Sequence, residues 1–327
     1  MINEGEYEMN AKYSLVSKDN KAELLFSNIL EMWLSLNEVK VKKSTYDKYS
    51  YMIEKHIYPE LGNMQLNKIN AITINKFVKQ KLICGSIEEH EPLSPSYVST
   101  MVIIIKSALD YAEKEKIYSG LNNPIYKPSK KNSEFNILTP NEINVLETYL
   151  NQHLGNTEIG VLLALFTGLR IGEVCALEWN NVDLKNRVIH IKSTVSRVKI
   201  EGKYTNIIGP PKTESSLRDI PIPNKLYKNL KVLYKERQSE FVISDKTSFV
   251  YPRTYEYRYH KILKAAQITD INFHSLRHTF ATYCISNGMD VKSLSEILGH
   301  ASTNITMQRY VHPSLEMKRK QLEMALN

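Results

Sequence analysis

The sequence lacks a hydrophobic run long enough to cross a membrane. Its longest apolar stretch, Ile159 to Phe166, is far shorter than the roughly 20 residues that a bilayer needs. The first residues, MINEGEYEMN, are acidic and have no apolar core, so they do not resemble a secretory signal. These absences predict that the protein has no membrane partner and is cytoplasmic.

Cysteine is scarce, with Cys84, Cys175 and Cys284 lying far apart in apolar stretches. This odd number of isolated cysteines predicts reduced core thiols rather than a disulfide framework or a zinc site. The sequence also contains no G-x-x-x-x-G-K-[ST], G-x-G-x-x-G, H-E-x-x-H or C-x-x-C motif. We therefore expect no metal and no nucleotide cofactor.

Arginine is missing from the first half of the chain, where lysine supplies all of the basic charge. All ten arginines of the 327 residues lie at or after Arg170. The chain has 43 Lys and Arg against 35 Asp and Glu, a formal charge of +8, which favours an anionic partner. In a chain this rich in lysine, each arginine directs attention to a need for the planar, forked guanidinium.

Hydrophobic periodicity predicts an all-helical first domain. Apolar residues recur at helical spacing from Leu24 onward, and a second helix is expected to begin with Ser44 as its N-cap. Pro59 and Gly62 are expected to end that helix. Pro124 marks the following linker.

The second domain begins with a capping box at Thr139 that has proline at the first helical position. Helical spacing then gives way to strand-forming residues near 188–195 and 217–222, and it returns from about Tyr255 to the end. We expect a mainly α protein with a small antiparallel β-sheet. Its predicted parts are a tail (1–20), an all-helical domain (21–121), a linker (122–134) and an α+β domain (135–327) ending in an amphipathic tail.

Several polar residues of the second domain lie at predicted helix starts. In the segment TGLRIGE (167–173), Gly168 breaks one helix, and Arg170 and Glu173 lie in the first turn of the next. A helix N-terminus with an arginine is suited to bind phosphate. Taken alone, however, the segment is explained more simply by a surface ion pair.

A second group comprises His274, Arg277 and His278, which share one stripe of a helix beside an apolar stripe. Two imidazoles and a guanidinium crowded at the edge of a core suggest a multivalent anion between them. A buried structural histidine would account for either imidazole alone, but it accounts poorly for the set.

Three further positions complete the series. His300 follows Gly299, the expected left-handed stop of a helix capped by Asp290. Tyr310 follows ten residues later, and Lys212 lies in a predicted turn before a strand. Singly, a tyrosine is usually a core residue and a lysine on a turn is usually solvated.

In this order, the TGLR-x-GE, PKT, H-x-L-R-H, LGH and tyrosine series closely resembles the catalytic domain of the tyrosine recombinases, the phage-type integrases. The resemblance covers about residues 135–327, and all six polar positions of the family's site are filled. It implies two phosphate clamps (Arg170, Arg277), a general acid (Lys212), proton-transfer or phosphate-binding groups (His274, His300), a nucleophile (Tyr310), a supporting residue (Glu173) and a packing residue (His278).

The first domain resembles the helical, SAM-like core-binding domain of integrases from conjugative transposons and phages. The resemblance lies in KSTY (43–46) and the following HIYPELG (56–62). It implies DNA contacts by Lys42, Lys43, Thr45 and Tyr46. Many such integrases carry an arm-site domain in front, whereas about 20 residues precede the helices here, so we expect a shortened form or one that works without arm sites.

The resemblance implies a site-specific recombinase that cuts and rejoins double-stranded DNA through a 3′-phosphotyrosine, without metal or ATP, to integrate or excise a mobile element. A tyrosine with a pKa near 10 needs help to ionise. We expect that help from His274 as a base, or from the positive field of the arginines, which would lower the pKa of Tyr310.

The implied partners are core-site DNA and further copies in a synaptic tetramer, with an excisionase or a host DNA-bending protein as additional candidates. The amphipathic tail (residues 315–326) closes its own core or docks on a neighbouring copy. Alternative functions are Xer-like resolution, a topoisomerase IB-like nicking and closing activity, and a DNA-binding regulator without catalysis. None of the six polar positions is substituted, which argues against the regulator.

Overall fold

The computed structural model describes residues 24–85, 91–129, 136–200, 203–211, 213–311 and 315–326. The chain forms two compact units, Met1–Ser133 and Glu134–Asn327. Each has its own apolar core. In the described part of the chain, no helix is both long enough and apolar enough to span a membrane.

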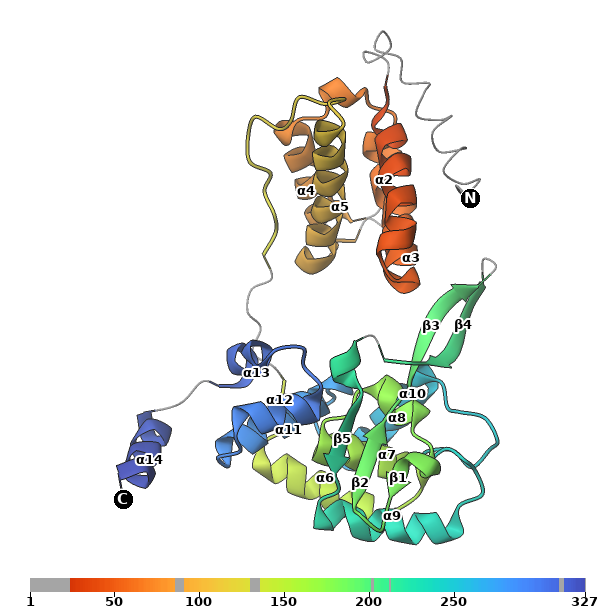
Figure 1. Ribbon diagram of the computed structural model, residues 1–327, viewed down its shortest axis with the longest axis vertical. Coiled ribbons are helices and arrows are strands. Elements are labelled where there is room, and N and C mark those ends of the chain that lie inside the picture. The colour runs from red at the N-terminus through yellow and green to blue at the C-terminus, as the bar shows by residue number, and fades with distance from the viewer. Residues whose placement is uncertain are drawn as a thin grey trace, which may run out of the picture. The chain divides into compact units, whose positions relative to one another are not determined.

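Within the described residues of the first unit, every helix or strand element named is a helix, joined by loops (Figure 1). Its elements are α2 (Phe26–Lys40), α3 (Lys43–Met52), the π-helical η1 (Ile53–Gly62), the short η2 (Leu66–Lys68), α4 (Ala71–Cys84) and α5 (Pro95–Lys114). Helix α5 carries the longest apolar stripe and packs on α2 and α4. Side-chain caps on Asn70 and Ser94 begin α4 and α5.

Two expectations for this unit were wrong. Ser44 is not an N-cap, because Lys42 takes that position and its carbonyl oxygen accepts the N–H groups of Thr45 and Tyr46. Pro59 lies inside η1 and does not end the helix, whereas Gly62 is its last residue, as expected. In a regular α-helix the proline ring would also clash with the carbonyl four residues back, and the wider π-helical turn relieves that clash.

The second unit contains a central buried helix and two small antiparallel sheets. Its first helices are α6 (Pro140–Gln152), α7 (Asn156–Thr167) and α8 (Ile171–Ala176). The capping box at Thr139 is confirmed. The longest apolar run of the sequence forms α7, which contacts α6, α9, α10 and α11.

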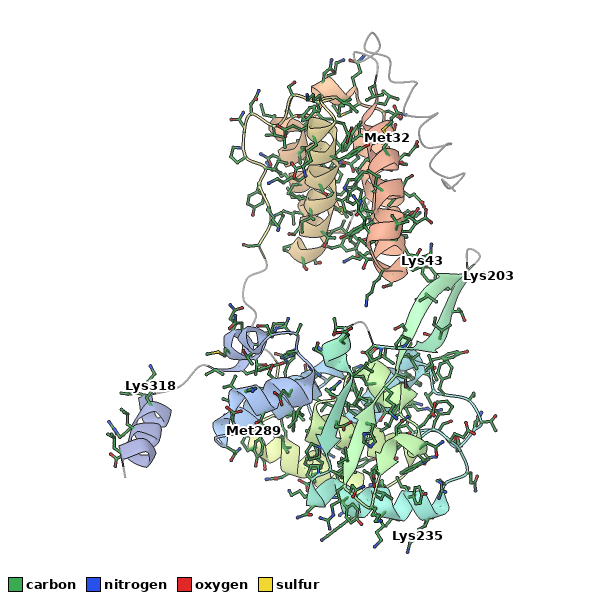
Figure 2. The ribbon with its side chains drawn as sticks, viewed as in Figure 1. Met32, Lys43, Lys203, Lys235, Met289 and Lys318 are labelled. Carbon is green, nitrogen blue, oxygen red and sulfur yellow. The ribbon has the colours of Figure 1, made fainter. Side chains whose placement is uncertain are left out.

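The three-stranded sheet has the order β1-β2-β5, and β3 pairs with β4 in a separate hairpin. The strands are β1 (Val182–Asp183), β2 (Val188–Ile191), β3 (Thr194–Ile200), β4 (Lys203–Gly209) and β5 (Arg218–Pro221), with η3 (Trp179–Asn181) and η4 (Glu214–Ser216) beside them. Figure 2 shows Lys203 at the tip of the β3–β4 hairpin.

The remaining helices follow the sheets. They are α9 (Asn224–Glu236), α10 (Pro252–Ala265), α11 (His274–Ser286), α12 (Val291–Leu298), α13 (Thr303–Tyr310) and α14 (Leu315–Leu326). Helices α11, α12 and α13 pack on one another around a small core of their own. The expected fold class, mainly α with small antiparallel sheets, is confirmed.

The expectation of three core thiols was wrong for one of them. Cys175 is buried, and burial raises the pKa of its thiol well above the usual value. Cys284 is half-buried with a pKa of about 11, raised by desolvation. Cys84 is exposed because it is the last residue of α4, where the helix leaves its core.

Candidate active site

The site begins where α7 gives way to α8. Gly168 has a left-handed backbone (φ 67°) that ends α7 and redirects the chain. Arg170 is then the N-cap of α8, and its backbone N–H and Nη1 both donate to the carboxylate of Glu173, at 3.0 and 2.7 Å. Arg170 keeps 35% of its side chain exposed, whereas Glu173 is 3% exposed. The guanidinium of Arg170 therefore faces the surface and is held in place by its ion pair with the buried carboxylate of Glu173.

Arg277, in the first turn of α11, is among the largest fully buried side chains of the described residues, with 2% exposed. Its Nη1 donates to the carbonyl of Gly168 at 2.8 Å and its Nη2 to the carbonyl of Leu298 at 2.7 Å. Burial, followed by the charge of Arg170, lowers the pKa of Arg277 to about 9. The guanidinium remains a cation near pH 7, and its bonds join α7, α11 and α12.

His300 is placed by the end of α12. Asp290 caps the helix start, and Gly299 has the expected left-handed conformation (φ 65°) at its end, so both expectations are confirmed. The ring Nδ1 of His300 lies 2.8 Å from the hydroxyl of Thr306 on α13. This bond fixes the imidazole beside the last helix of the site.

Tyr310, the last residue of α13, is 5% exposed. Its hydroxyl lies 2.8 Å from Nδ1 of His278, and its ring stacks on that of His300 with centroids 6.4 Å apart. His274 packs edge-on against His278 at 4.7 Å. Two imidazoles, His278 and His300, thus contact the phenol of Tyr310, and the third, His274, contacts His278.

The three imidazoles are neutral near pH 7. Desolvation and, second to it, neighbouring charges together lower the pKa of His274, His278 and His300 to about 4. The charges are arginines for His274 and His300, and His274 followed by arginines for His278. Each ring can therefore accept a proton at neutral pH.

The expected lowering of the pKa of Tyr310 was wrong. The charges of Arg277 and Arg309 do act to lower it, but desolvation by burial is larger, and the pKa of Tyr310 is raised overall. A buried phenol of this kind needs a base in contact with it. The imidazole in contact is that of His278, for which only a packing role was expected, and not that of His274.

The remaining predicted residues lie elsewhere or outside the described residues. Lys212 falls outside them. Lys42 and Lys43 are exposed at the start of α3 in the first unit, where Figure 2 shows Lys43. Thr45 and Tyr46 are half-buried on the same turn, and the Lys43 ammonium lies 4.8 Å from the centre of the Tyr46 ring.

Arg218 and Arg309 were not among the residues predicted for the site. Arg309 precedes Tyr310 and acts on its hydroxyl through charge and a side-chain hydrogen bond. Arg218, on β5, donates to both carboxylate oxygens of Glu173. The available signal was the rarity of arginine, since both belong to the ten that the sequence confines to its second part.

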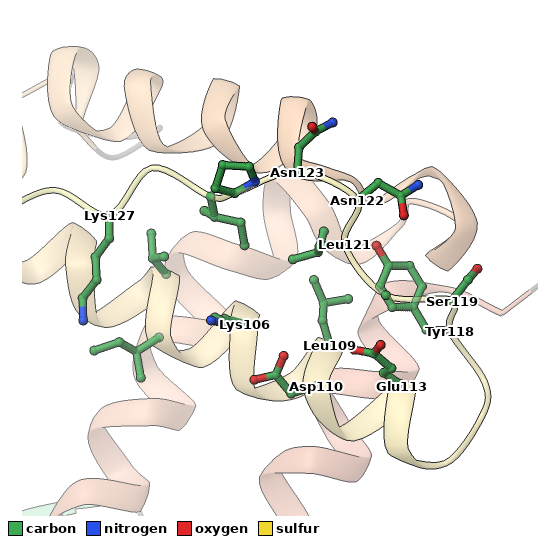
Figure 3. A pocket seen from close by; sticks show the side chains of 15 residues that line it. Lys106, Leu109, Asp110, Glu113, Tyr118, Ser119, Leu121, Asn122, Asn123 and Lys127 are labelled. Carbon is green, nitrogen blue, oxygen red and sulfur yellow. The ribbon is translucent and has the colours of Figure 1, made fainter.

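A separate groove of about 700 Å³ lies in the first unit, between α5 and residues 118–127. Figure 3 shows Lys106, Asp110 and Glu113 of α5 beside it, with Lys127 from the segment that follows. None of the predicted site residues lines it. Across the described ranges, no three His, Cys, Asp or Glu side chains are grouped as metal ligands.

The structure brings together an arginine pair, three histidines and a buried tyrosine, the residue types that the resemblance to the tyrosine recombinases places in one site. Two families match the chain: the phage integrase family over residues 136–317, and the phage integrase N-terminal SAM-like domain over residues 25–82. The first match spans more than half of the sequence, and the chain belongs to the phage integrase family. It is an enzyme of the tyrosine-recombinase class, of the transposon or phage integrase type.

Two curated relatives and one solved structure illustrate the similarity. A XerC-like tyrosine recombinase of Caldanaerobacter subterraneus subsp. tengcongensis is 26% identical over 92% of this chain and 82% of its own length. The ICEBs1 integrase of Bacillus subtilis is 25% identical over 88% and 78%. The Tn1549 transposon integrase in complex with transposon right end DNA superposes with a TM-score of 0.74 over 93% of this chain and all of that one, at 20% identity.

Proposed function

We propose that this chain is a cytoplasmic, site-specific DNA recombinase that integrates or excises a mobile element through a 3′-phosphotyrosine on Tyr310. One observation carries the proposal: Arg170, Arg277, His278 and His300, from α8, α11 and the end of α12, surround the single tyrosine at the end of α13. A structural tyrosine would not need two arginines and two neutral imidazoles around it.

The arginines would stabilise charge on the phosphate. Attack on a DNA phosphodiester builds extra negative charge on the non-bridging oxygens of a pentacoordinate transition state. Guanidinium groups fixed in advance stabilise that charge without having to reorganise. Arg277 is held by two backbone carbonyls and Arg170 by Glu173, so both are fixed before substrate arrives.

The imidazoles would move the phenolic proton. The raised pKa of Tyr310 keeps it protonated near pH 7, and neutral His278, with its own proton on Nε2, can accept through Nδ1. The Tyr310 oxygen then bonds to phosphorus and the bond to the 5′-oxygen breaks. Lys212 would supply the proton to that 5′-oxygen, with His274 and His300 binding the phosphate or relaying protons.

Rejoining runs the same steps backward with the 5′-hydroxyl of another strand. Because the phosphotyrosine stores the bond energy, no ATP is needed. Lys42, Lys43, Thr45 and Tyr46 of the first unit would contact the same duplex. We propose a synaptic tetramer as the working assembly, with an excisionase or a host DNA-bending protein as further partners.

The test is to trap the covalent complex. A fluorescent duplex carrying the joined ends of the element that encodes this chain is incubated with the full chain. It is nicked just downstream of the cut, so that the short fragment bearing the freed 5′-hydroxyl diffuses away and cannot be rejoined. A protein–DNA band that survives denaturant and disappears with protease is the expected result, and sequencing locates the cut. If only non-covalent binding occurs at every junction tested, the chain is a DNA-binding regulator.

A further inference from the structure

Arg218 lies in the site, but the reaction outlined above gives it no role. It begins β5, is 5% exposed, and its Nη1 and Nη2 donate to Oε1 and Oε2 of Glu173 at 3.1 and 2.9 Å. Its Nη1 also donates to the Ser216 carbonyl at 3.0 Å, and its Nε donates to the Ile297 carbonyl at 2.5 Å. Four of its five N–H groups are thus engaged by protein.

A phosphate clamp needs two parallel donors facing its ligand, as in the forked arginine–phosphate pair. Arg218 has no such pair left, because its fork is already closed on Glu173. It therefore cannot be a third phosphate clamp, although it is as much a cation as Arg170 and Arg277. Its effect on the reaction must pass through the groups that it holds.

The first of these groups is Glu173. Burial would raise the pKa of this carboxyl, but the hydrogen bonds and charge of Arg218, followed by those of Arg170, lower it to about 2. The carboxylate is thus a permanent anion within bonding distance of a proposed clamp. Without Arg218, the whole negative charge of the Glu173 carboxylate would act on Arg170. The positive field that Arg170 offers to the phosphate would then be weaker.

The second group is the end of α12. The last carbonyls of a helix have no partner within it. Here three successive ones accept from three arginines: Ile297 from Arg218 at 2.5 Å, Leu298 from Arg277 at 2.7 Å and Gly299 from Arg170 at 3.5 Å. His300 is the next residue, so the same guanidinium groups set its position. Gly299 also lies so close to Arg218 that an added Cβ would be 3.0 Å from its Cδ.

We infer that Arg218 is a positioning residue of the recombinase site, which neutralises Glu173 so that Arg170 keeps its charge for phosphate and which fixes the turn that presents His300. This inference rests on the proposed function. If the inference holds, the cation of Arg218 helps the reaction and an unneutralised anion on Glu173 slows it. Removing Arg218 therefore harms the reaction because the carboxylate of Glu173 is left without its partner. Removing that carboxylate as well should therefore restore part of the rate.

The test compares single-turnover rates of adduct formation on the nicked duplex for the wild-type chain, Arg218→Met, Glu173→Gln and the double variant. We expect Arg218→Met to slow the reaction ~10–100-fold, the range that small misplacement of catalytic groups produces. The double variant should be at least about fivefold faster than Arg218→Met, because its glutamine can still accept from Arg170 but carries no charge. Arg187→Met, at an exposed turn outside the site, is the matched control and should react at the wild-type rate.

The outcomes separate the inference from the proposed function. If the wild-type chain forms no adduct, the function fails. If it does and Arg218→Met reacts equally fast, Arg218 has no positioning role. If Arg218→Met is slow and the double variant is equally slow or slower, while circular dichroism shows that both fold, Arg218 acts by packing alone and charge neutralisation is refuted. Should Arg218→Met fail to fold, Arg218→Gln replaces it in the same comparison, because glutamine also removes the cation but keeps a polar side chain that can donate hydrogen bonds.

Discussion

Glu173→Gln should destabilise the second unit by a predictable amount. The carboxylate is 3% exposed between two guanidinium groups, which lower its pKa from the usual 4.5 to about 2 against the effect of burial. A drop of ~2.5 pKa units corresponds to ~3 kcal/mol of native-state stabilisation of the ionised form. Breaking a buried ion pair from one side costs ~3–5 kcal/mol. Glutamine still accepts hydrogen bonds, so we expect a loss of ~3 kcal/mol.

The pH dependence has a defined sign. Because the folded-state pKa of Glu173 is depressed, its stabilisation is fully present above the unfolded pKa near 4.5 and is lost as the pH falls toward 2. The advantage of the wild-type chain over Glu173→Gln should therefore be constant from about pH 7 to 6. By about pH 3.5 it should have shrunk by ~1 kcal/mol.

The assay is urea unfolding followed by tryptophan fluorescence. The chain has two tryptophans, Trp33 in the first unit and Trp179 in the second, both with 6% exposed. A Trp33→Phe background makes the signal report the second unit alone. Glu147→Gln is the matched control, since Glu147 pairs with Lys225, whose side chain is 65% exposed. Such a pair is worth at most ~1 kcal/mol.

The reasoning is refuted if Glu173→Gln costs no more than Glu147→Gln. It is also refuted if the loss stays the same down to about pH 3.5, because the stabilisation would then not come from the ionised carboxylate. Either result would remove the electrostatic basis for the network of Glu173 with Arg170 and Arg218.

Three further predictions concern the reaction. Gly299→Ala places a Cβ 2.9 Å from the Ser215 carbonyl oxygen, at a backbone φ of 65°. It should slow adduct formation and lower the melting temperature more than Gly288→Ala, because Gly288 has a φ of 85° but open space around it. Equal effects of the two changes would show that backbone strain alone matters. Cleavage should persist in excess EDTA, since Arg170 and Arg277 would stabilise the phosphate charge, and loss of cleavage restored by Mg²⁺ would contradict this role. Lys212→Ala should be partly rescued by a substrate with sulfur at the 5′-bridging position, because a thiolate leaves without a proton; failure of sulfur to rescue it would exclude Lys212 as the acid.

Much of the site could be predicted because its residues lie at helix ends whose signals are local. Gly168 and Gly299 adopt the left-handed conformation, and Asp290 caps α12, as their sequence positions indicate. Such caps act within four residues, so a single sequence contains them. They place Arg170 and His300 at helix boundaries before any tertiary contact is known.

What could not be predicted depends on tertiary contact. The bond between His278 and Tyr310 joins residues 32 positions apart, and the one between Arg218 and Ile297 joins residues 79 apart. The pKa of Tyr310 is raised because the effect of burial is larger than that of the nearby cations. The spacing of apolar residues in the sequence does not indicate which of these two effects is larger. In the first unit, Pro59 stays inside a helix because a π-helical turn accommodates it, where local propensity predicts an end.

The most direct test of the central claim is to identify the residue that carries the DNA. The trapped adduct is digested with nuclease and trypsin, and mass spectrometry locates the residual 3′-phosphonucleotide on a peptide. The mass should lie on Tyr310, and Tyr310→Phe should bind the duplex with unchanged affinity yet form no adduct, because the change removes one oxygen and keeps the ring. A modification on any other residue, or an adduct that persists in Tyr310→Phe, would contradict the account.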